Sequence, residues 1–225
     1  MLHTNLSQNN ADSAGWKCCG LLSLCFLLLG LLLSMNTIRS ENEALASRLS
    51  PSILRFHILA NSDSKEDQQV KLEVRSLVLD YVQKHLPPDA GKADTIRYLN
   101  TNQTEIESMA DSYLKSRGFD YTASLELTNC YFPSRTYDSL TFPSGYYDAA
   151  RILLGKGEGH NWWCVLYPRF CFVDAACKAV PEESREQLKA DIKQDDYLAL
   201  KQDNRPEITF RFRLFPSVTL RQPGP

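Results

Sequence analysis

The feature that most limits what this chain can be is an uninterrupted apolar stretch at residues 18–35. These 18 residues include no charged side chain, and as a helix they would reach about 27 Å, close to the roughly 30 Å hydrocarbon core of a bilayer. The Leu-rich centre, residues 21–33, also has the length of a signal-peptide apolar region. Three alternatives follow: an uncleaved membrane anchor, a cleaved signal peptide or a buried core helix. The core helix is the least favoured, because hardly any polar residue interrupts the run.

The position of this stretch in the chain predicts export. Lys17 precedes it and Arg39 follows it, so the charge difference that orients membrane segments is small. The layout is more informative, because a short polar segment lies before the stretch and all of the foldable chain lies after it. We therefore predict a cytoplasmic tail at 1–17, a signal peptide or transmembrane anchor at 18–35, and a linker or short frayed helix at 36–50.

The rest of the chain has the composition of a folded domain. Hydrophobic residues make up 43% of the chain and aromatic residues 10%, enough for a packed core. The 25 basic residues against 27 acidic ones give a net charge of −2. A weakly acidic protein is a poor non-specific ligand for nucleic acid, because phosphate binding depends on Lys and Arg. We predict one extracytoplasmic domain at 51–216, a C-terminal tail at 217–225, and no nucleic-acid partner.

Hydrophobic periodicity in this domain predicts an α+β fold with a mixed or antiparallel sheet and packed helices. Ser64 should cap a helix that ends before Pro87, with Asp67 three residues later as a variant capping box. A second helical region should break near residues 100–102 and end at Gly118. Alternating or apolar runs predict strands at 53–60, 119–132, 149–154, 161–167 and 208–215, and a late helix should start at Pro181.

Two features suggest a ligand or a functional surface, and each has a plainer interpretation. The glycine cluster at 155–159 lacks the Gly-Lys-Ser/Thr ending of a phosphate-binding loop and the third glycine of a dinucleotide fingerprint. We interpret it as a flexible hairpin connection between strands 149–154 and 161–167. Arg55 and His57 interrupt an apolar strand, where they could line a functional surface or simply a wet sheet face.

Four cysteines lie in the predicted domain, and an even number in an exported protein is compatible with disulfides. A turn at residues 167–170 would place Cys164 and Cys171 on facing arms, at a separation that a disulfide accepts. We predict this disulfide, with two unpaired core thiols as the alternative. The pattern does not decide whether Cys130 and Cys177 pair.

Little in the sequence supports a catalytic site or a metal site. A nucleophilic Cys164 would need a lowered thiol pKa and an oriented base such as His57 or His160, and His160 is not well placed four residues away on the same strand. Cys164, Cys171, Cys177 and His160 lack the paired short spacing of zinc sites. We therefore predict no catalytic residue, metal or cofactor.

Two blocks of the sequence are distinctive as whole runs. They are ILRFHILANSDSKEDQQVKLEVR at 53–75 and FPSGYYDAARILLGKGEGHNWWCVLYPRFCFVD at 142–174. In these blocks the chain resembles the stage II sporulation protein R family of endospore-forming bacteria, and the likeness extends more loosely over 51–216. Arg169 departs from the family pattern, which usually has a second proline there.

The resemblance implies a signal rather than an enzyme. Members of this family are thought to be made in the forespore and exported into the septal intermembrane space, where they activate a membrane-embedded aspartic protease of the mother cell that cleaves the sigma-E precursor. The alternatives are a cysteine-dependent extracytoplasmic hydrolase and a structural septal or cell-wall binding module. Because loops carry exposed polar groups on a rigid frame, we expect the partner to contact residues in two segments, namely Asn61, Ser62, Asp63, Ser64, His160, Asn161, Trp162 and Trp163.

Overall fold

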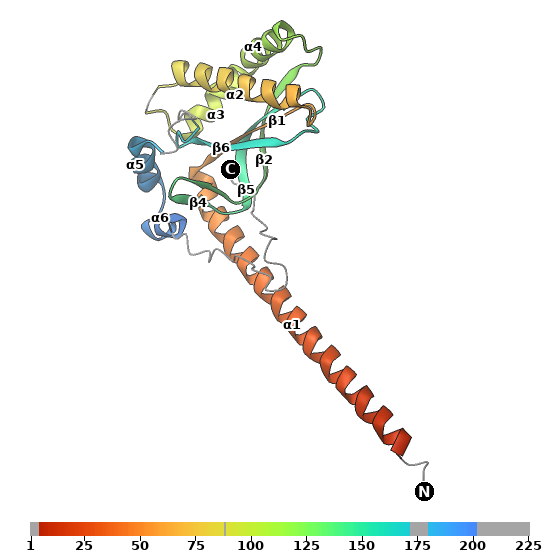
Figure 1. Cartoon of the computed structure of the whole chain (residues 1–225). Coiled ribbons are helices and arrows are strands. Elements are labelled where there is room, and N and C mark those ends of the chain that lie inside the picture. Colours follow the sequence, from red (N-terminus) through yellow and green to blue (C-terminus); the bar gives the residue numbers. More distant parts are fainter. Residues whose placement is uncertain (1–4, 88, 172–179, 202–225) are drawn as a thin grey trace.

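A single long helix, α1 (Asn5–Leu49), carries the apolar stretch and projects from a folded domain (Figure 1). The computed structural model describes residues 5–87, 89–171 and 180–201. The apolar part of α1 is long and apolar enough to cross a membrane, and none of it is buried against the domain. The core-helix alternative is therefore wrong, and a signal peptide and a membrane anchor remain.

Residues 36–49 continue α1 instead of forming a linker or a short frayed helix. Their composition is polar, but Ala46 and Leu49 lie on one side of the helix and are buried in the domain core. The 3₁₀ turn η1 (Ser50–Ser52) then leads directly into the first strand. The helix and the domain are thus joined without a flexible segment.

The sheet is mixed and has the order β2-β5-β1-β6, which confirms the predicted α+β class. Strand β1 (Leu54–Leu59) runs parallel to β5 (Gly145–Leu154) and antiparallel to β6 (Asn161–Tyr167), while β2 (Ala123–Phe132) is antiparallel to β5. The predicted hairpin between β5 and β6 is wrong, because β1 lies between these two strands. The glycine-rich connection therefore crosses over the end of β1.

Three helices cover one face of the sheet: α2 (Lys65–His85), α3 (Lys92–Thr101) and α4 (Gln103–Ser116) (Figure 1). The predicted start of α2 is confirmed, because the Ser64 hydroxyl accepts a hydrogen bond from the backbone N–H of Asp67 at 3.1 Å. The predicted break separates α3 from α4, and Gly118 follows α4 with φ +87°. The apolar stripe of these helices meets alternate residues of the strands, such as Phe56, Ile58 and Ile152.

The other face packs against the end of α1, the hairpin β3 (Arg135–Tyr137) and β4 (Leu140–Phe142), and helices α5 (Glu182–Asp191) and α6 (Gln194–Lys201). Helix α5 begins after Pro181, as predicted. The predicted strand at 208–215 and Cys177 lie outside the described residues.

Candidate functional site

The two loops that the sequence places in the candidate site meet at one end of the sheet. Because β1 and β5 are parallel, both strands finish at this end, and the chain leaving β5 must pass the chain leaving β1 to reach β6. Backbone hydrogen bonds join the loops, from Glu158 to the carbonyl of Asn61 at 3.3 Å and from Gly159 to that of Ala60 at 2.9 Å. We call residues 60–64 and 155–160, with Asp67 and Lys71 of α2, the polar junction.

The glycines of the junction permit a close approach of the two loops. A Cβ on Gly155, which has φ +56°, would lie 2.3 Å from Oδ1 of Asn61. A Cβ on Gly159 would lie 2.2 Å from the carbonyl oxygen of Ser62. The glycine cluster thus serves contact between loops, and the flexible hairpin role predicted for it does not apply.

Asp67 is the buried centre of the junction, with 5% of its surface exposed. Its carboxylate accepts hydrogen bonds from Asn61 Nδ2 at 3.0 Å, Ser62 Oγ at 2.6 Å and Tyr121 Oη at 2.6 Å. Burial by itself raises the pKa of Asp67, but the hydrogen bonds from Ser62, Tyr121 and Asn61 outweigh it and leave the pKa below its ordinary value. Asn61 also accepts from the backbone N–H of Lys156 at 3.0 Å. These side chains therefore tie three segments together.

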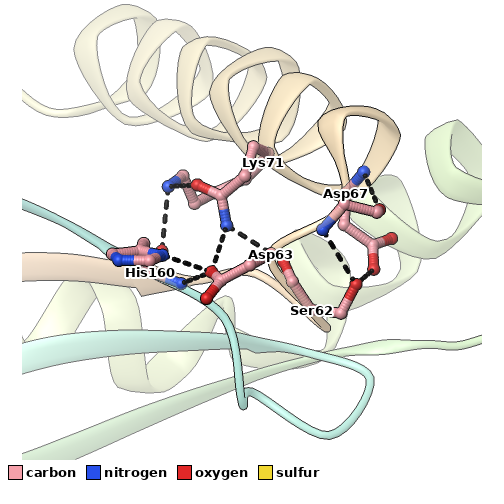
Figure 2. A network of polar contacts seen from close by, with 7 residues as sticks. Ser62, Asp63, Asp67, Lys71 and His160 are labelled. Carbon is pink, nitrogen blue, oxygen red and sulfur yellow. Dashed lines mark hydrogen bonds and ion pairs between the residues drawn. The ribbon is translucent and has the colours of Figure 1, made fainter.

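Asp63 and His160 form the exposed part of the junction (Figure 2), with 55% and 78% of their side chains exposed. The Asp63 carboxylate accepts from the His160 backbone N–H at 2.7 Å and from the His160 ring nitrogen Nδ1. The hydrogen bond from the His160 side chain lowers the pKa of Asp63. Lys71 donates to the His160 carbonyl at 2.9 Å, so helix α2 also holds this loop.

The structure brings five of the predicted residues together and separates the others. Asn61, Ser62, Asp63, Ser64 and His160 all lie in the polar junction, whereas the following strand residues diverge. Trp162 faces the helical side, where it meets the ring of Phe56 at 6.1 Å and the guanidinium of Arg75 at 4.8 Å. Trp163 faces the opposite side. Asn161 pairs with Leu59 at the start of β6.

Arg55 does not lie on a wet sheet face, because it is 0% exposed. Its guanidinium lies 4.7 to 5.7 Å from the ring centres of Phe132, Tyr137, Phe142 and Tyr147. We call these five residues the aromatic cluster. Alternation within β1 places Arg55 on one face of the sheet. The pattern of β1 does not predict that the hairpin β3–β4 covers this face.

His57 lies next to this cluster and is also buried. Its ring stacks on Trp163 at 4.8 Å and 3°, and Nε2 lies 3.6 Å from Sγ of Cys130. Burial lowers the pKa of His57 to about 4, although the Asn161 side chain opposes this shift, and burial raises the pKa of Cys130. Near pH 7 the pair is therefore a neutral thiol beside a neutral imidazole. That is a poor arrangement for a thiolate nucleophile.

Cys164 and Cys171 form a disulfide with a Cα–Cα distance of 5.6 Å, as predicted. The sulfur of Cys164 is consequently not available as the nucleophile of the hydrolase alternative. Within 5–87, 89–171 and 180–201, no group of three or more His, Cys, Asp or Glu residues could hold a metal ion.

Comparison with known proteins identifies the domain. The family described as stage II sporulation protein R matches residues 50–177, a range that contains the polar junction and the aromatic cluster. Stage II sporulation protein R of Bacillus subtilis (strain 168) is 33% identical over 147 residues, which cover 65% of this chain and 65% of that protein. No solved structure matches. Because the family match covers more than half of the sequence, this chain belongs to the stage II sporulation protein R family.

Proposed function

We propose that this chain is an exported sporulation signal that activates a membrane-embedded aspartic protease in the neighbouring mother cell and so triggers maturation of the sigma-E precursor. The observation that carries the proposal is the family match, which covers the whole four-stranded sheet behind the apolar helix. The apolar helix supports export from the forespore into the septal intermembrane space.

Activation by contact requires that the chain bind the active conformation of the protease more tightly than the inactive one. A rigid contact surface favours such binding, because little conformational entropy is lost on association. The polar junction has this property, since hydrogen bonds to Asp67, Lys71 and the backbone hold both of its loops.

The junction also suggests which residues have which role. Asn61 and Ser62 are bound to Asp67, so we assign them to positioning the loop. Asp63 and His160 are bound to each other but remain exposed, so we assign them to direct contact with the protease. Trp162 and Trp163 lie on opposite faces of the sheet and support the fold rather than one shared contact surface.

The test is to produce the full chain in cells that contain the protease and the sigma-E precursor. We expect precursor cleavage that depends on the chain, and His160→Ala to reduce it roughly tenfold, the effect of a contact worth about 1.4 kcal/mol. Glu66→Ala changes an exposed residue of α2 near the junction and is the matched control. No cleavage with the unaltered chain would contradict the function, whereas full cleavage with His160→Ala at normal protein levels would contradict only the contact surface.

Two cysteine variants separate the signal from the hydrolase alternative. Cys164→Ser and Cys171→Ser should each lower the free energy of unfolding by about 2.5 kcal/mol, because each opens the same short loop. Their effects on precursor cleavage should also be equal. A loss of activity confined to Cys164→Ser, with normal stability, would instead support a nucleophilic thiol.

A further inference from the structure

Strand β2 forms one edge of the sheet, and only the first half of this edge is covered. The strand pairs with β5 alone, in continuous register along its whole length. In the first half, side chains of α4 bind the outward backbone groups of β2. Asp111 accepts from the N–H of Ala123 at 2.6 Å. Leu125 is bound twice, its N–H by Glu107 and its carbonyl by Gln103, each at 2.8 Å.

The second half of this edge is open. In an antiparallel pair, the backbone groups of alternate residues point away from the partner strand. Those of Leu127, Asn129 and Tyr131 therefore face outward, as those of Leu125 do. Within the part of the chain that the structure describes, no hydrogen bond reaches these outward groups. Such a row of unpaired N–H and C=O groups is a template for another extended chain.

The two faces of the open half differ in polarity. Cys130 and Phe132 lie on the side of the aromatic cluster, where Phe132 is fully buried and Cys130 is half-buried. Asn129 and Tyr131 lie on the other side and are exposed. Because side chains alternate along a strand, a strand added here should be apolar on one face and polar on the other.

The C-terminal segment of this chain contains a run with that pattern. Residues 202–225 lie outside the described residues. Within them, apolar residues alternate with polar ones, namely Ile208, Phe210, Phe212 and Leu214 with Thr209, Arg211 and Arg213. The apolar set matches the side of the aromatic cluster. The arginines match the exposed side, where the Tyr131 ring and the carboxylate of Asp148, which is 46% exposed and accepts from Asn129 at 3.0 Å, both attract a guanidinium.

The C-terminal segment is also long enough to reach the open edge. It follows α6, which packs against β4. Phe142 of β4 and Phe132 of β2 border the same Arg55 guanidinium, with ring centres 5.6 and 4.7 Å from it. The seven residues from Lys201 to Ile208 extend over about 23 Å. The path from α6 past β4 to the end of β2 lies within this reach.

We propose that the open half of β2 binds residues 208–215 of the same chain as a fifth strand of the sheet. The added strand pairs with the outward backbone groups of Leu127, Asn129 and Tyr131 and covers the side chain of Cys130. This inference goes beyond the proposed function, because it assigns an occupant to an edge that would otherwise be free to pair with a second copy or another protein.

The test is amide hydrogen exchange in the full chain, held in detergent micelles and resolved to single residues. The N–H groups of Leu127, Asn129 and Tyr131 should exchange at least about a hundredfold more slowly than in an unfolded chain, because each is bound in a ladder. Rapid exchange of these three amides, while the amides of β5 stay protected, would overturn the proposal.

Two double variants show whether residues 208–215 supply the protection. Phe210→Asp with Phe212→Asp removes the apolar face of the added strand and should return the three amides to rapid exchange. Val218→Asp with Leu220→Asp makes the same chemical change outside this strand and should leave them protected. Protection that survives in the phenylalanine variant would overturn the proposal.

Dilution distinguishes the chain's own segment from that of a second copy. Protection within one chain should not change on dilution, and light scattering should show monomers. Protection that falls together with the dissociation of a dimer would overturn the proposal in favour of a second copy. These measurements involve no protease, so their outcome is independent of the precursor-cleavage assay.

Discussion

The polar junction and the aromatic cluster each bury a charged side chain close to β1, but they surround it differently. Asp67 accepts three side-chain hydrogen bonds, each between 2.6 and 3.0 Å. Arg55 makes one long hydrogen bond, from Nη2 to the hydroxyl of Tyr137 at 3.4 Å. Among the described residues its Nε and Nη1 have no partner, and aromatic rings fill the space around them.

The two sites therefore have different structural roles: the polar junction connects segments of the chain, whereas the aromatic cluster fills the core. Hydrogen bonds to a carboxylate are directional, so Asp67 fixes the relative positions of the loop after β1, helix α2 and Tyr121. The attraction between a guanidinium and aromatic rings has less directional demand, and burial opposes it. Burial accordingly lowers the pKa of Arg55, although arginine remains protonated. We expect removal of the charged group to lower the free energy of unfolding more in the polar junction than in the aromatic cluster.

The largest expected effect is that of Asp67→Ala. It leaves the donors of Asn61, Ser62 and Tyr121 without their acceptor, which should lower the free energy of unfolding by about 3–4 kcal/mol. Denaturant unfolding measures this change, with Glu66→Ala on the same turn as the control, expected within about 0.5 kcal/mol of the unaltered chain. Equal stability of the two variants would show that the carboxylate does not hold the junction together.

Acidification should act next most strongly, through His57 beside the aromatic cluster. Its pKa is lowered to about 4 by burial, so between pH 6.5 and 4 the unfolded chain binds a proton that the folded chain does not. Stability is therefore lost as the pH falls through this window, by about 3 kcal/mol at its lower end. Unfolding measured across the window should show this loss, and His57→Gln should remove most of it.

At still lower pH, protonation of Asp67 also lowers the free energy of unfolding. Its folded-state pKa lies below the ordinary value, so its stabilising contribution is present above the unfolded pKa and is lost as the pH falls through the folded pKa. A chain with His57→Gln that still loses stability steeply between pH 6.5 and 4 would place the pH sensitivity elsewhere.

Gly159→Ala tests the close approach of the two loops. The new Cβ would meet the carbonyl oxygen of Ser62 at 2.2 Å, so the backbones must separate, at a cost of about 2 kcal/mol. Lys156→Ala alters an exposed side chain of the same loop and should change the free energy of unfolding by less than about 0.5 kcal/mol. If both variants unfold at the same denaturant concentration, the loops are not in tight contact.

Arg55→Met should have the smallest effect, within about 1 kcal/mol in either direction. It removes a buried charge with two unpartnered nitrogens and keeps much of the volume among the rings. Arg55→Ala should cost more, about 2–3 kcal/mol, because it leaves a cavity. A methionine variant as unstable as the alanine variant would mean that the guanidinium is required, and the contrast with Asp67 would then fail.

The local elements of this protein are predictable from the sequence. The Ser64 cap, the break between α3 and α4 and the alternation in β2 follow from side chains close together in the chain, and so do the α+β class and the disulfide between Cys164 and Cys171. The interactions that decide such features span a few residues, so the spacing of polar and apolar side chains is sufficient to predict them.

Which segments meet depends on tertiary packing. The insertion of β1 between β5 and β6 turned an expected hairpin into a crossing, and this crossing brings His160 to Asp63 and the glycines to Asn61. Tertiary packing also places Ala46 against the sheet and covers Arg55 with a hairpin that is distant in sequence. Pairing between distant strands depends on the free energy of the whole packed domain, which no local pattern records.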